Sequence, residues 1–344
     1  MSRIYIAGCG AVSPAGWSVQ QLCDAIHAAA PIPVKPLTRP GWPNPLTVRQ
    51  VVSADPKPSF MGHARLRRTS PITQYVVSAA LEALGDDLAL VRNGTLRLGI
   101  VLCVMSGCVN YTRRFFDETV KDPSTASPLI FPETVFNAPS SHIATLLGTK
   151  SMNYSIVGDP GTFLQGLALG AQWLAQGNVD GCLVLAGEEC DWLTSDAFRH
   201  FSRKIILSDG AGAIYLKAGV PGNSSVELRS ITDSHLFSRD HRRDQAIQRV
   251  AEQLPPCSPD HLLCDGLQGV PRIDAPEIAA WKSWNGARVS PKSILGEGLM
   301  AAASWQCIHA IQALRMDLYP AASVSVLGCN QQAIGAHFTA TKGV

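Results

Sequence analysis

Residues 153–176 read NYSIVGDPGTFLQGLALGAQWLAQ, and this stretch decides the fold. Residues 153–157 are a short, mostly apolar run that predicts a strand, and residues 162–176 have the spacing of a helix. The helix is rich in alanine, glycine and leucine, as is a second predicted helix over residues 299–316. Since a helix that is apolar all round is a buried helix, we expect both to lie between sheets at the centre of the protein.

Outward from this stretch, predicted strands and helices alternate along the whole chain, which is typical of an α/β fold with buried sheets. Residues 31–58 are rich in proline, without periodicity, and predict a long surface excursion. The predicted strands cover residues 3–7, 96–105, 153–157, 182–186, 213–217, 226–232, 261–264, 288–291, 323–327 and 333–339. The predicted helices cover residues 19–30, 72–84, 134–147, 162–176, 244–253, 277–284 and 299–316.

These elements form two series of similar order, each a βαβαβαββ half. The stretch PGNSS over residues 221–225 is the expected join. We therefore expect an N-terminal half over residues 1–220 and a C-terminal half over residues 221–344, packed together as one unit. With both apolar helices in the middle, the layers would run helix, sheet, helix, sheet, helix.

Composition excludes several classes of protein. Of 344 residues, 46% are hydrophobic and 16% charged, which is the reverse of the balance in disordered chains. The net charge of +2 does not indicate the strongly basic surface that is typical of nucleic-acid-binding proteins. Local basic groups are expected to form a solvated rim, with docking of an acidic partner the minor alternative; they are Arg65, Arg67 and Arg68, then Arg113 and Arg114, then Arg239, Arg242 and Arg243.

The cysteines and the N-terminal residues bear on the compartment. None of the ten cysteines forms a CxxC pair or a Cys/His metal spacing, so we expect reduced thiols, no metal and no cofactor. Residues 1–12 lack the features of a signal peptide, and no apolar run is long enough to span a bilayer. These observations predict a cytoplasmic protein without a membrane span.

Several segments, in order, resemble the β-ketoacyl synthase family. They are IAGCGAVSPAG at residues 6–16, SPLIFPETVFNAPSSHIATLLGTKSMNYSIVGD at 127–159, GNVDGCLVLAGEE at 177–189, SDGAGAIYLK at 208–217, PKSILG at 291–296 and LGCN at 327–330. The order and spacing of these segments carry the resemblance, which spans nearly the whole chain. It implies the thiolase-like fold, in agreement with the two halves inferred above.

The resemblance also exposes the loss of the family's reactive groups. A condensing member needs a cysteine at a helix N-terminus and two histidines. Here Pro160 stands at the cysteine position, Asp265 in CDGLQG at the first histidine position and Glu297 at the second. Lys292 is retained and could pair with Glu297, and we expect Asp265 and Glu297 to be close together. Cys182, inside an apolar strand, and Cys190, at the start of a loop, do not replace the nucleophile.

Family members without the catalytic set include chain-length factors, which pair with an active ketosynthase and shape the tunnel of the growing chain. The resemblance implies that role here, with an acyl carrier protein reached through the complex. The resemblance also implies that the strand over residues 153–157 pairs across the dimer, and its exposed edge would need such a partner to avoid aggregation. The residues expected at the tunnel or interface are Ser106, Tyr111, Phe115, Ile130, Phe131, Thr134 and Phe136.

Two features point to a divergent member. The family's segment before SDGAG is reduced here to DWLTSDAFRHFSRKIIL, residues 191–207, and Pro160 stands where chain-length factors of aromatic polyketide systems usually carry glutamine. We therefore favour a reducing type II system that makes polyenes, such as aryl polyenes, in a polyketide or fatty-acid-like pathway.

Two alternatives remain open at this stage. One is a divergent acyltransferase, decarboxylase or hydrolase that uses Asp265, Glu297 and Lys292 for acid–base chemistry. The other is a structural homodimer with no tunnel role.

Overall fold

The computed structural model describes residues 3–219, 225–238 and 242–341. Within these residues the main sheet has 11 strands, of which ten run in the order β12-β11-β13-β14-β9-β1-β8-β6-β4-β5, and β10 pairs with β14. The strands of the N-terminal half are β1 (Ile4–Val12), β4 (Leu98–Val104), β5 (Asn153–Val157), β6 (Gly181–Glu188) and β8 (Gly210–Ala218). Those of the C-terminal half are β9 (Ser225–Ile231), β10 (His235–Leu236), β11 (Leu262–Cys264), β12 (Ala287–Val289), β13 (Ala321–Leu327) and β14 (Gln332–Thr341).

The strand pairing repeats between the two halves. In each, two strand pairings are parallel and two are antiparallel, so four strands run one way and one, β8 or β14, runs the other: β5-β4-β6-β8-β1 on one side corresponds to β12-β11-β13-β14-β9 on the other. The halves meet where β1 pairs with β9 over only two residue pairs, Tyr5 with Glu227 and Ile6 with Val226. The two sheets expected from the sequence are therefore joined edge to edge. The expected boundary at residue 220 lies outside the described residues and stays a prediction.

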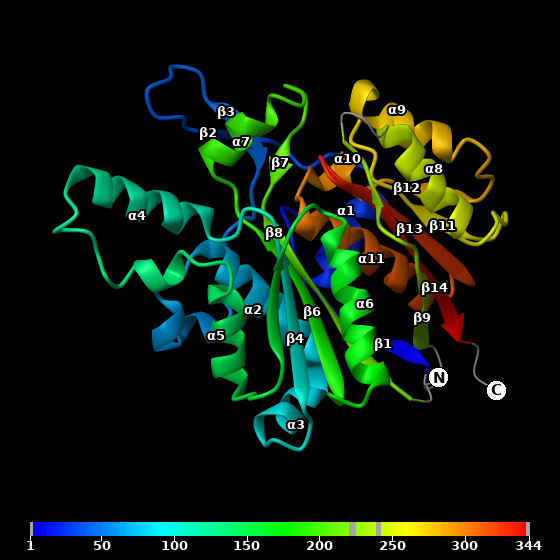
Figure 1. Cartoon of the computed structure of the whole chain (residues 1–344), viewed down its shortest axis with the longest axis horizontal. Helices are drawn as coiled ribbons and strands as arrows, with labels where there is room; N and C mark the ends of the chain where they lie inside the picture. Colours follow the sequence, from blue (N-terminus) through cyan, green and yellow to red (C-terminus); the bar gives the residue numbers. More distant parts are fainter. Residues whose placement is uncertain (1–2, 220–224, 239–241, 342–344) are drawn as a thin grey trace.

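The helices form three layers around these sheets (Figure 1). The outer helices of the N-terminal half include α2 (Pro71–Leu84), α3 (Leu88–Arg92) and α5 (Ala138–Leu147), and those of the C-terminal half are α8 (Arg243–Gln253) and α9 (Pro271–Ala280). The central layer is α6 (Thr162–Ala175) and α11 (Met300–Arg315), joined by α1 (Val19–Ala28) and α10 (Pro291–Leu295). The α/β class and the layer order expected from the sequence are confirmed.

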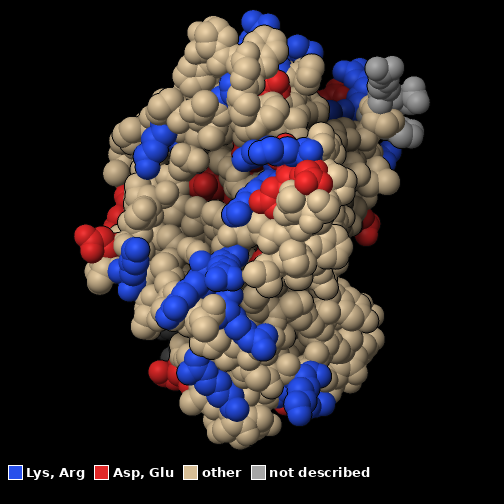
Figure 2. Space-filling view, turned by 90° about the vertical axis from the view of Figure 1, so that its left-hand side faces the viewer, with Lys and Arg blue, Asp and Glu red and all other residues tan. Residues whose placement is uncertain are grey.

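An arm over residues 109–137 projects from this body (Figure 1). It consists of α4 (Val109–Lys121) and a returning loop that contains the 3₁₀ turn η4 (Phe131–Glu133). None of the residues of α4 is buried. Figure 2 looks onto the side from which the arm projects, and uncharged residues cover much of that face between groups of Lys and Arg.

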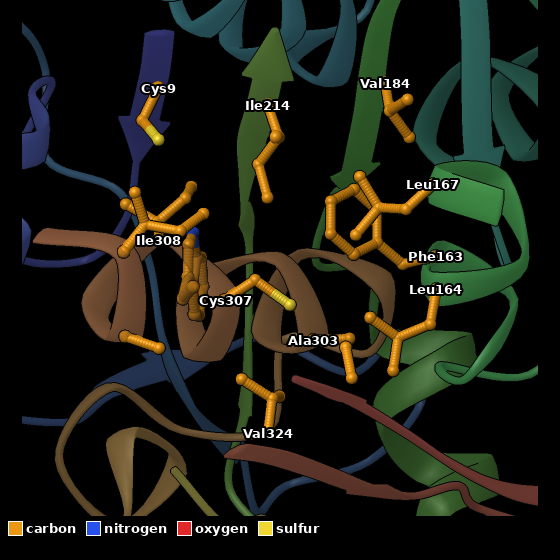
Figure 3. Packing of buried hydrophobic residues seen from close by; sticks show 14 of the residues in the cluster. Cys9, Phe163, Leu164, Leu167, Val184, Ile214, Ala303, Cys307, Ile308 and Val324 are labelled. Carbon is orange, nitrogen blue, oxygen red and sulfur yellow. The ribbon is translucent and has the colours of Figure 1, made fainter. Parts of the chain in front are cut away.

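The core lies where the central helices meet both halves of the sheet (Figure 3). Cys9, Val184 and Ile214 point toward α6 and α11 from one side, and Val324 approaches from the other. Fourteen of the sixteen residues of α11 are buried, which is the environment that its apolar composition predicted. None of the described helices has the length and apolar character needed to cross a membrane.

The structure corrects several local predictions. The excursion at residues 31–58 is not wholly a surface loop, because β2 (Lys35–Leu37) and β3 (Leu46–Arg49) form a small sheet with β7 (Leu207–Ser208), and Val48 is fully buried. Residues 59–66 add the short 3₁₀ turns η1 (Ser59–Gly62) and η2 (Ala64–Leu66), and η3 (Gly85–Asp87) follows α2. The helix predicted at residues 134–147 begins at Ala138, and α9 begins six residues before the predicted 277 because Pro271 opens it.

Candidate functional site

The turn between β5 and α6 has the geometry of an elbow. Asp159 and Pro160 are both buried, and α6 follows from its N-cap, Gly161. Proline fits just before the helix because the N–H it lacks would have no partner within the first turn. The elbow therefore persists as a structure while residue 160 carries no nucleophile.

The carboxylate of Asp159 accepts four backbone N–H groups from the loop between β13 and β14. The donors are the amides of Cys329, Asn330, Gln331 and Gln332, at N···O distances of 2.9, 3.3, 3.4 and 3.2 Å. Burial raises the pKa of Asp159, and these four bonds, which lower it, offset that only in part. This loop contains part of the LGCN segment, and Asp159 ends the segment that leads to the elbow. The resemblance therefore identified both segments, but it did not predict that they are in contact.

Lys292 and Glu297 form the ion pair that the sequence suggested. The Nζ of Lys292 lies 2.8 Å from Oε2 of Glu297, and both side chains are about 98% buried or more. Burial lowers the pKa of Lys292, but the charge of Glu297 and its other neighbours more than offset this, so that pKa is raised. Glu297 also accepts hydrogen bonds from Nε2 of Gln268 and from the amide of Leu299.

Asp265 faces other partners than Glu297. Its Oδ2 accepts hydrogen bonds from Nε and Nη2 of Arg288, at 3.0 and 2.8 Å, and its Oδ1 accepts the hydroxyl of Ser290. No hydrogen bond joins Asp265 to Glu297 among the described residues, and the expected closeness of the two acids stays a prediction. Arg288 on β12 pairs with Asp265, and Lys292 on α10 pairs with Glu297.

A fourth buried carboxyl group at this site, that of Glu277 on α9, was not predicted from the sequence. It accepts the amide of Gly266 and the hydroxyl of Ser325. Burial, with the charge of Asp265 second, raises the pKa of Glu277 to about 7. No motif marks this residue, because only the fold brings α9 against the start of the CDGLQG segment.

A cavity of about 260 Å³ lies beside these groups. Glu297 and Gln268 line it together with Cys329 and Gly328 of the loop that holds Asp159. Its other lining residues are Phe198, His200, Phe201, Ile205, Arg243, Arg272, Ile273 and Leu327. Of Pro160, Asp265, Lys292 and Glu297, the described cavity lining includes Glu297 alone.

The thiols near this site are poor nucleophiles. Burial, followed by the charges of Glu297 and Asp159, raises the pKa of Cys329 well above its usual value. Burial also raises the pKa of Cys182 to about 12 and that of Cys190 well above its usual value. Cys190 does not simply begin a loop, as expected: Asp191 caps α7 (Trp192–Phe198) directly after it. A thiolate is the reactive form, so none of these thiols is activated.

The residues expected at a tunnel or interface gather on the arm and at its root. The rings of Phe115 and Phe131 are 5.4 Å apart, and the hydroxyl of Thr112 donates to the carbonyl of Thr134. The ring of Phe136 packs over Gly107, where a Cβ would lie only 2.5 Å from it. Tyr111 is half-buried, whereas Ile130 is buried and the hydroxyl of Ser106 donates to Glu188, so these last two face inward.

The arm presents apolar side chains to solvent. Phe116 and Val120 on α4 are 64% and 68% exposed, and the returning loop adds further exposed apolar residues: Leu129, Phe131, Val135 and Phe136. β5 lies at the edge of the main sheet, with Tyr154 and Val157 about half exposed. The helix α5 joins the two regions. It follows the arm, and the backbone carbonyl of its Ser140 accepts a hydrogen bond from the side-chain Nδ2 of Asn153 on β5.

The start of the arm is fixed to buried carboxylates at the end of β6. The amide of Asn110 donates to Glu189, and the guanidinium of Arg113 bonds to Asp191 at 2.6 Å. Arg113 is therefore a structural residue and not part of a solvated rim, whereas Arg65, Arg67 and Arg68 are exposed. The acidic residues after GCLVLAG thus position the arm.

Comparison with known proteins agrees with this geometry. The family model of the β-ketoacyl synthase N-terminal domain matches residues 1–215. This chain belongs to the β-ketoacyl synthase family. A search of curated proteins returned no significant match.

Solved structures show the same thiolase-like fold. The ishigamide ketosynthase/chain length factor superposes with a TM-score of 0.81 at 18% identity, covering 99% of this chain and 100% of that one. A β-ketoacyl synthase from Burkholderia phymatum gives 0.79 at 13% identity, covering 99% and 100%. One chain from the structure of a type II polyketide acyl-carrier protein in complex with its ketosynthase superposes with a TM-score of 0.77 at 14% identity, covering 99% of each chain.

Proposed function

We propose that this chain is a non-catalytic subunit of the chain-length-factor kind, which pairs with an active ketosynthase and shapes the tunnel that holds the growing acyl chain. The observation that carries this proposal is the elbow, where buried Pro160 replaces the nucleophile and the adjoining carboxylate of Asp159 is already held by four amides. An elbow that keeps its shape without its chemistry suits a subunit that contributes structure to a competent partner.

The arm and β5 supply the surface for that pairing. Exposed apolar side chains on the arm and an open strand edge lie on one side of the molecule, and both are unfavourable in water. A ketosynthase that presents an equivalent edge strand and apolar arm would bury them. The side chains of Phe115, Phe131 and Phe136 would then form part of the wall of the shared tunnel.

The finer assignment follows from the same features. We place the pair in the cytoplasm, in a type II polyketide or fatty-acid-like system of the polyene kind, with an acyl carrier protein delivering substrates to the partner. The structural neighbours support the general kind, because two are named as a ketosynthase/chain length factor and as a ketosynthase with its carrier protein. The polyene assignment rests on Pro160 and on the short segment over residues 191–207.

Co-expression with a ketosynthase that retains the cysteine and both histidines tests the proposal. We expect the two chains to co-purify as a 1:1 pair, with condensing activity that disappears when the partner's cysteine is replaced and is retained in Pro160→Ala of this chain. Condensation or acyl hydrolysis by this chain alone would instead favour the enzyme alternative. A stable homodimer that never exchanges with a ketosynthase would favour the structural one, since an open β5 edge serves two identical chains as well.

A further inference from the structure

The loop over residues 328–332 has the properties of an anion-binding nest. Four successive backbone N–H groups converge on one carboxylate, and the loop connects two strands of the C-terminal half. Successive amides that point into one concavity bind anions through their aligned dipoles. The anion here is a side chain of the same protein, from the opposite half.

The surroundings of Asp159 are built for its carboxylate. The residue is only 1% exposed. A Cβ on Gly328 would lie 1.6 Å from Oδ2 of Asp159, so glycine at this position leaves the room that the carboxylate occupies. The side chain therefore fills the nest completely, and a second anion has no space there while Asp159 is present.

The nest adjoins the cavity beside the elbow. Gly328 and Cys329 belong both to the cavity wall and to the loop that holds Asp159, and Nη2 of Arg243 donates to the carbonyl of Gly328. Arg243 and Arg272 line the same cavity. A small anion that entered the cavity would thus meet the guanidinium groups of Arg243 and Arg272, and also the carboxylate of Glu297, which Lys292 pairs.

We propose that residues 328–332 form a binding site for small carboxylate anions, which this chain keeps filled with Asp159. The carboxylate acts as a built-in ligand that closes the nest to acyl or carboxylate groups in the cavity. Removing that side chain would open the site to a free monocarboxylate such as formate. This inference is independent of pairing with a ketosynthase.

The test compares thermal unfolding of wild type and Asp159→Ala in sodium formate and in sodium chloride of equal ionic strength. In chloride we expect Asp159→Ala to unfold at a lower temperature, because four buried amides lose a charged acceptor. Formate should restore stability along a saturating curve, with an unfolding equilibrium constant lowered about 100-fold at 100 times the Kd of formate. Wild type should respond equally to the two salts.

Two matched variants sharpen the result. Asp159→Asn fills the same volume and should show no formate response. Asp274→Ala removes another buried aspartate that accepts only two amides, those of Gln268 and Val270, and should show a much weaker response or none. A formate response of equal size in all three variants, or none in Asp159→Ala, would overturn the proposal.

Folding of the key variant is itself informative. If Asp159→Ala does not fold in chloride, refolding in formate decides the question: recovery in formate alone supports the nest, and failure in both salts overturns it.

A double-mutant cycle with Gly328→Ala gives a second measure. Its clash with Asp159 should vanish in the Asp159→Ala background, whereas its 2.7 Å approach to the carbonyl of Gln332 is common to both backgrounds and cancels. Additive effects would contradict the assigned role of Asp159.

Discussion

The elbow and the arm differ in the surroundings of their side chains. Around the elbow, the buried carboxylates of Asp159, Asp265 and Glu297 all find partners within the chain. On the arm, apolar side chains such as Phe116, Val120 and Leu129 stand in solvent. These three buried carboxylates are thus paired within the chain, whereas the apolar side chains of the arm are exposed. The contrast separates a buried polar site from an exposed apolar surface.

The physical reasons for the two arrangements differ. Buried charges without partners cost several kcal/mol each, and Arg288 and Lys292 avoid that cost by neutralising Asp265 and Glu297. Exposed apolar surface is tolerated in a folded chain, but an open strand edge beside it favours association. Four sets of substitutions test whether this contrast holds.

Charge on the open edge or on the arm should weaken pairing with the ketosynthase. We expect Val157→Arg on β5 and, separately, Phe131→Asp on the arm to raise the Kd of the pair about thirtyfold or more, the effect of losing an interface hot spot. Titration by analytical ultracentrifugation measures this. Leu236→Asp on β10 is the control, because Leu236 is also an exposed apolar residue, at 69%, but lies in the other half. Unchanged affinity in both test variants would refute the assigned surface.

Breaking the buried ion pair should destabilise the chain strongly. In Glu297→Gln the ammonium of Lys292 stays buried without its counter-charge, and we expect a loss of about 3–5 kcal/mol in the free energy of unfolding. Urea titration followed by circular dichroism measures this. Asp180→Asn, in the solvent-exposed pair with Arg97, should have little effect. An equally small loss in Glu297→Gln would show that the site around the elbow is not closed in the way described.

Glu277 should make stability depend on pH. Its pKa is raised from 4.5 to about 7 in the folded state, so the folded chain holds a proton that the unfolded chain has released between these values. The contribution of Glu277 to the free energy of unfolding is therefore fully present below pH 4.5. It falls by about 3 kcal/mol as the pH rises from 4.5 to 7, and it is constant above pH 7.

The Glu277→Gln variant isolates this contribution. Glu188 and Asp209, each with a pKa raised by burial to about 7, act in the same direction, whereas His309 and His337, lowered by burial to about 4, act in the opposite one. The difference between wild type and Glu277→Gln, from urea titrations between pH 4 and 8, removes these shared terms. A difference that does not vary with pH would show that Glu277 is ionised in the fold.

Trimming aromatic rings on the arm should lengthen the products of the reconstituted pair. Phe136→Ala and Phe115→Ala remove volume from the expected tunnel wall, and a longer chain then fits. Mass spectrometry of the products measures the shift, with Leu236→Ala as a control distant from the arm. Unchanged products in both variants would separate the arm's role in pairing from any role in length control.

Much of the fold could be predicted from the sequence because the signals are local. The strand over residues 153–157 has the predicted bounds, and α6 and α11 end within one residue of theirs, since their apolar composition admits only a buried position. The arm and α7 were missed as helices. The sequence of α4 is amphipathic, but none of its residues is buried, so its apolar side chains do not pack into the core, and α7 is only seven residues long.

The candidate site could be predicted only in part. The replacements at Pro160, Asp265 and Glu297 are visible in the sequence once the family resemblance is noticed, and so is the nearby Lys292. The partners of Asp159 and Asp265, and the presence of Glu277, are not visible. Glu277 and Ser325 are 48 residues apart, and Asp159 lies 170 to 173 residues from the amides it accepts.

By itself, the sequence determined the α/β class and the repeated order of elements, because both depend on residue type and short-range periodicity. Through the family resemblance it also predicted that Pro160 stands at the position of the nucleophile. Only the tertiary structure decided where each buried carboxylate found its partner, and which apolar residues stayed in solvent. The reason is geometric: hydrogen bonds and ion pairs require atoms within about 3 Å, and only chain folding brings groups from the two halves to that distance.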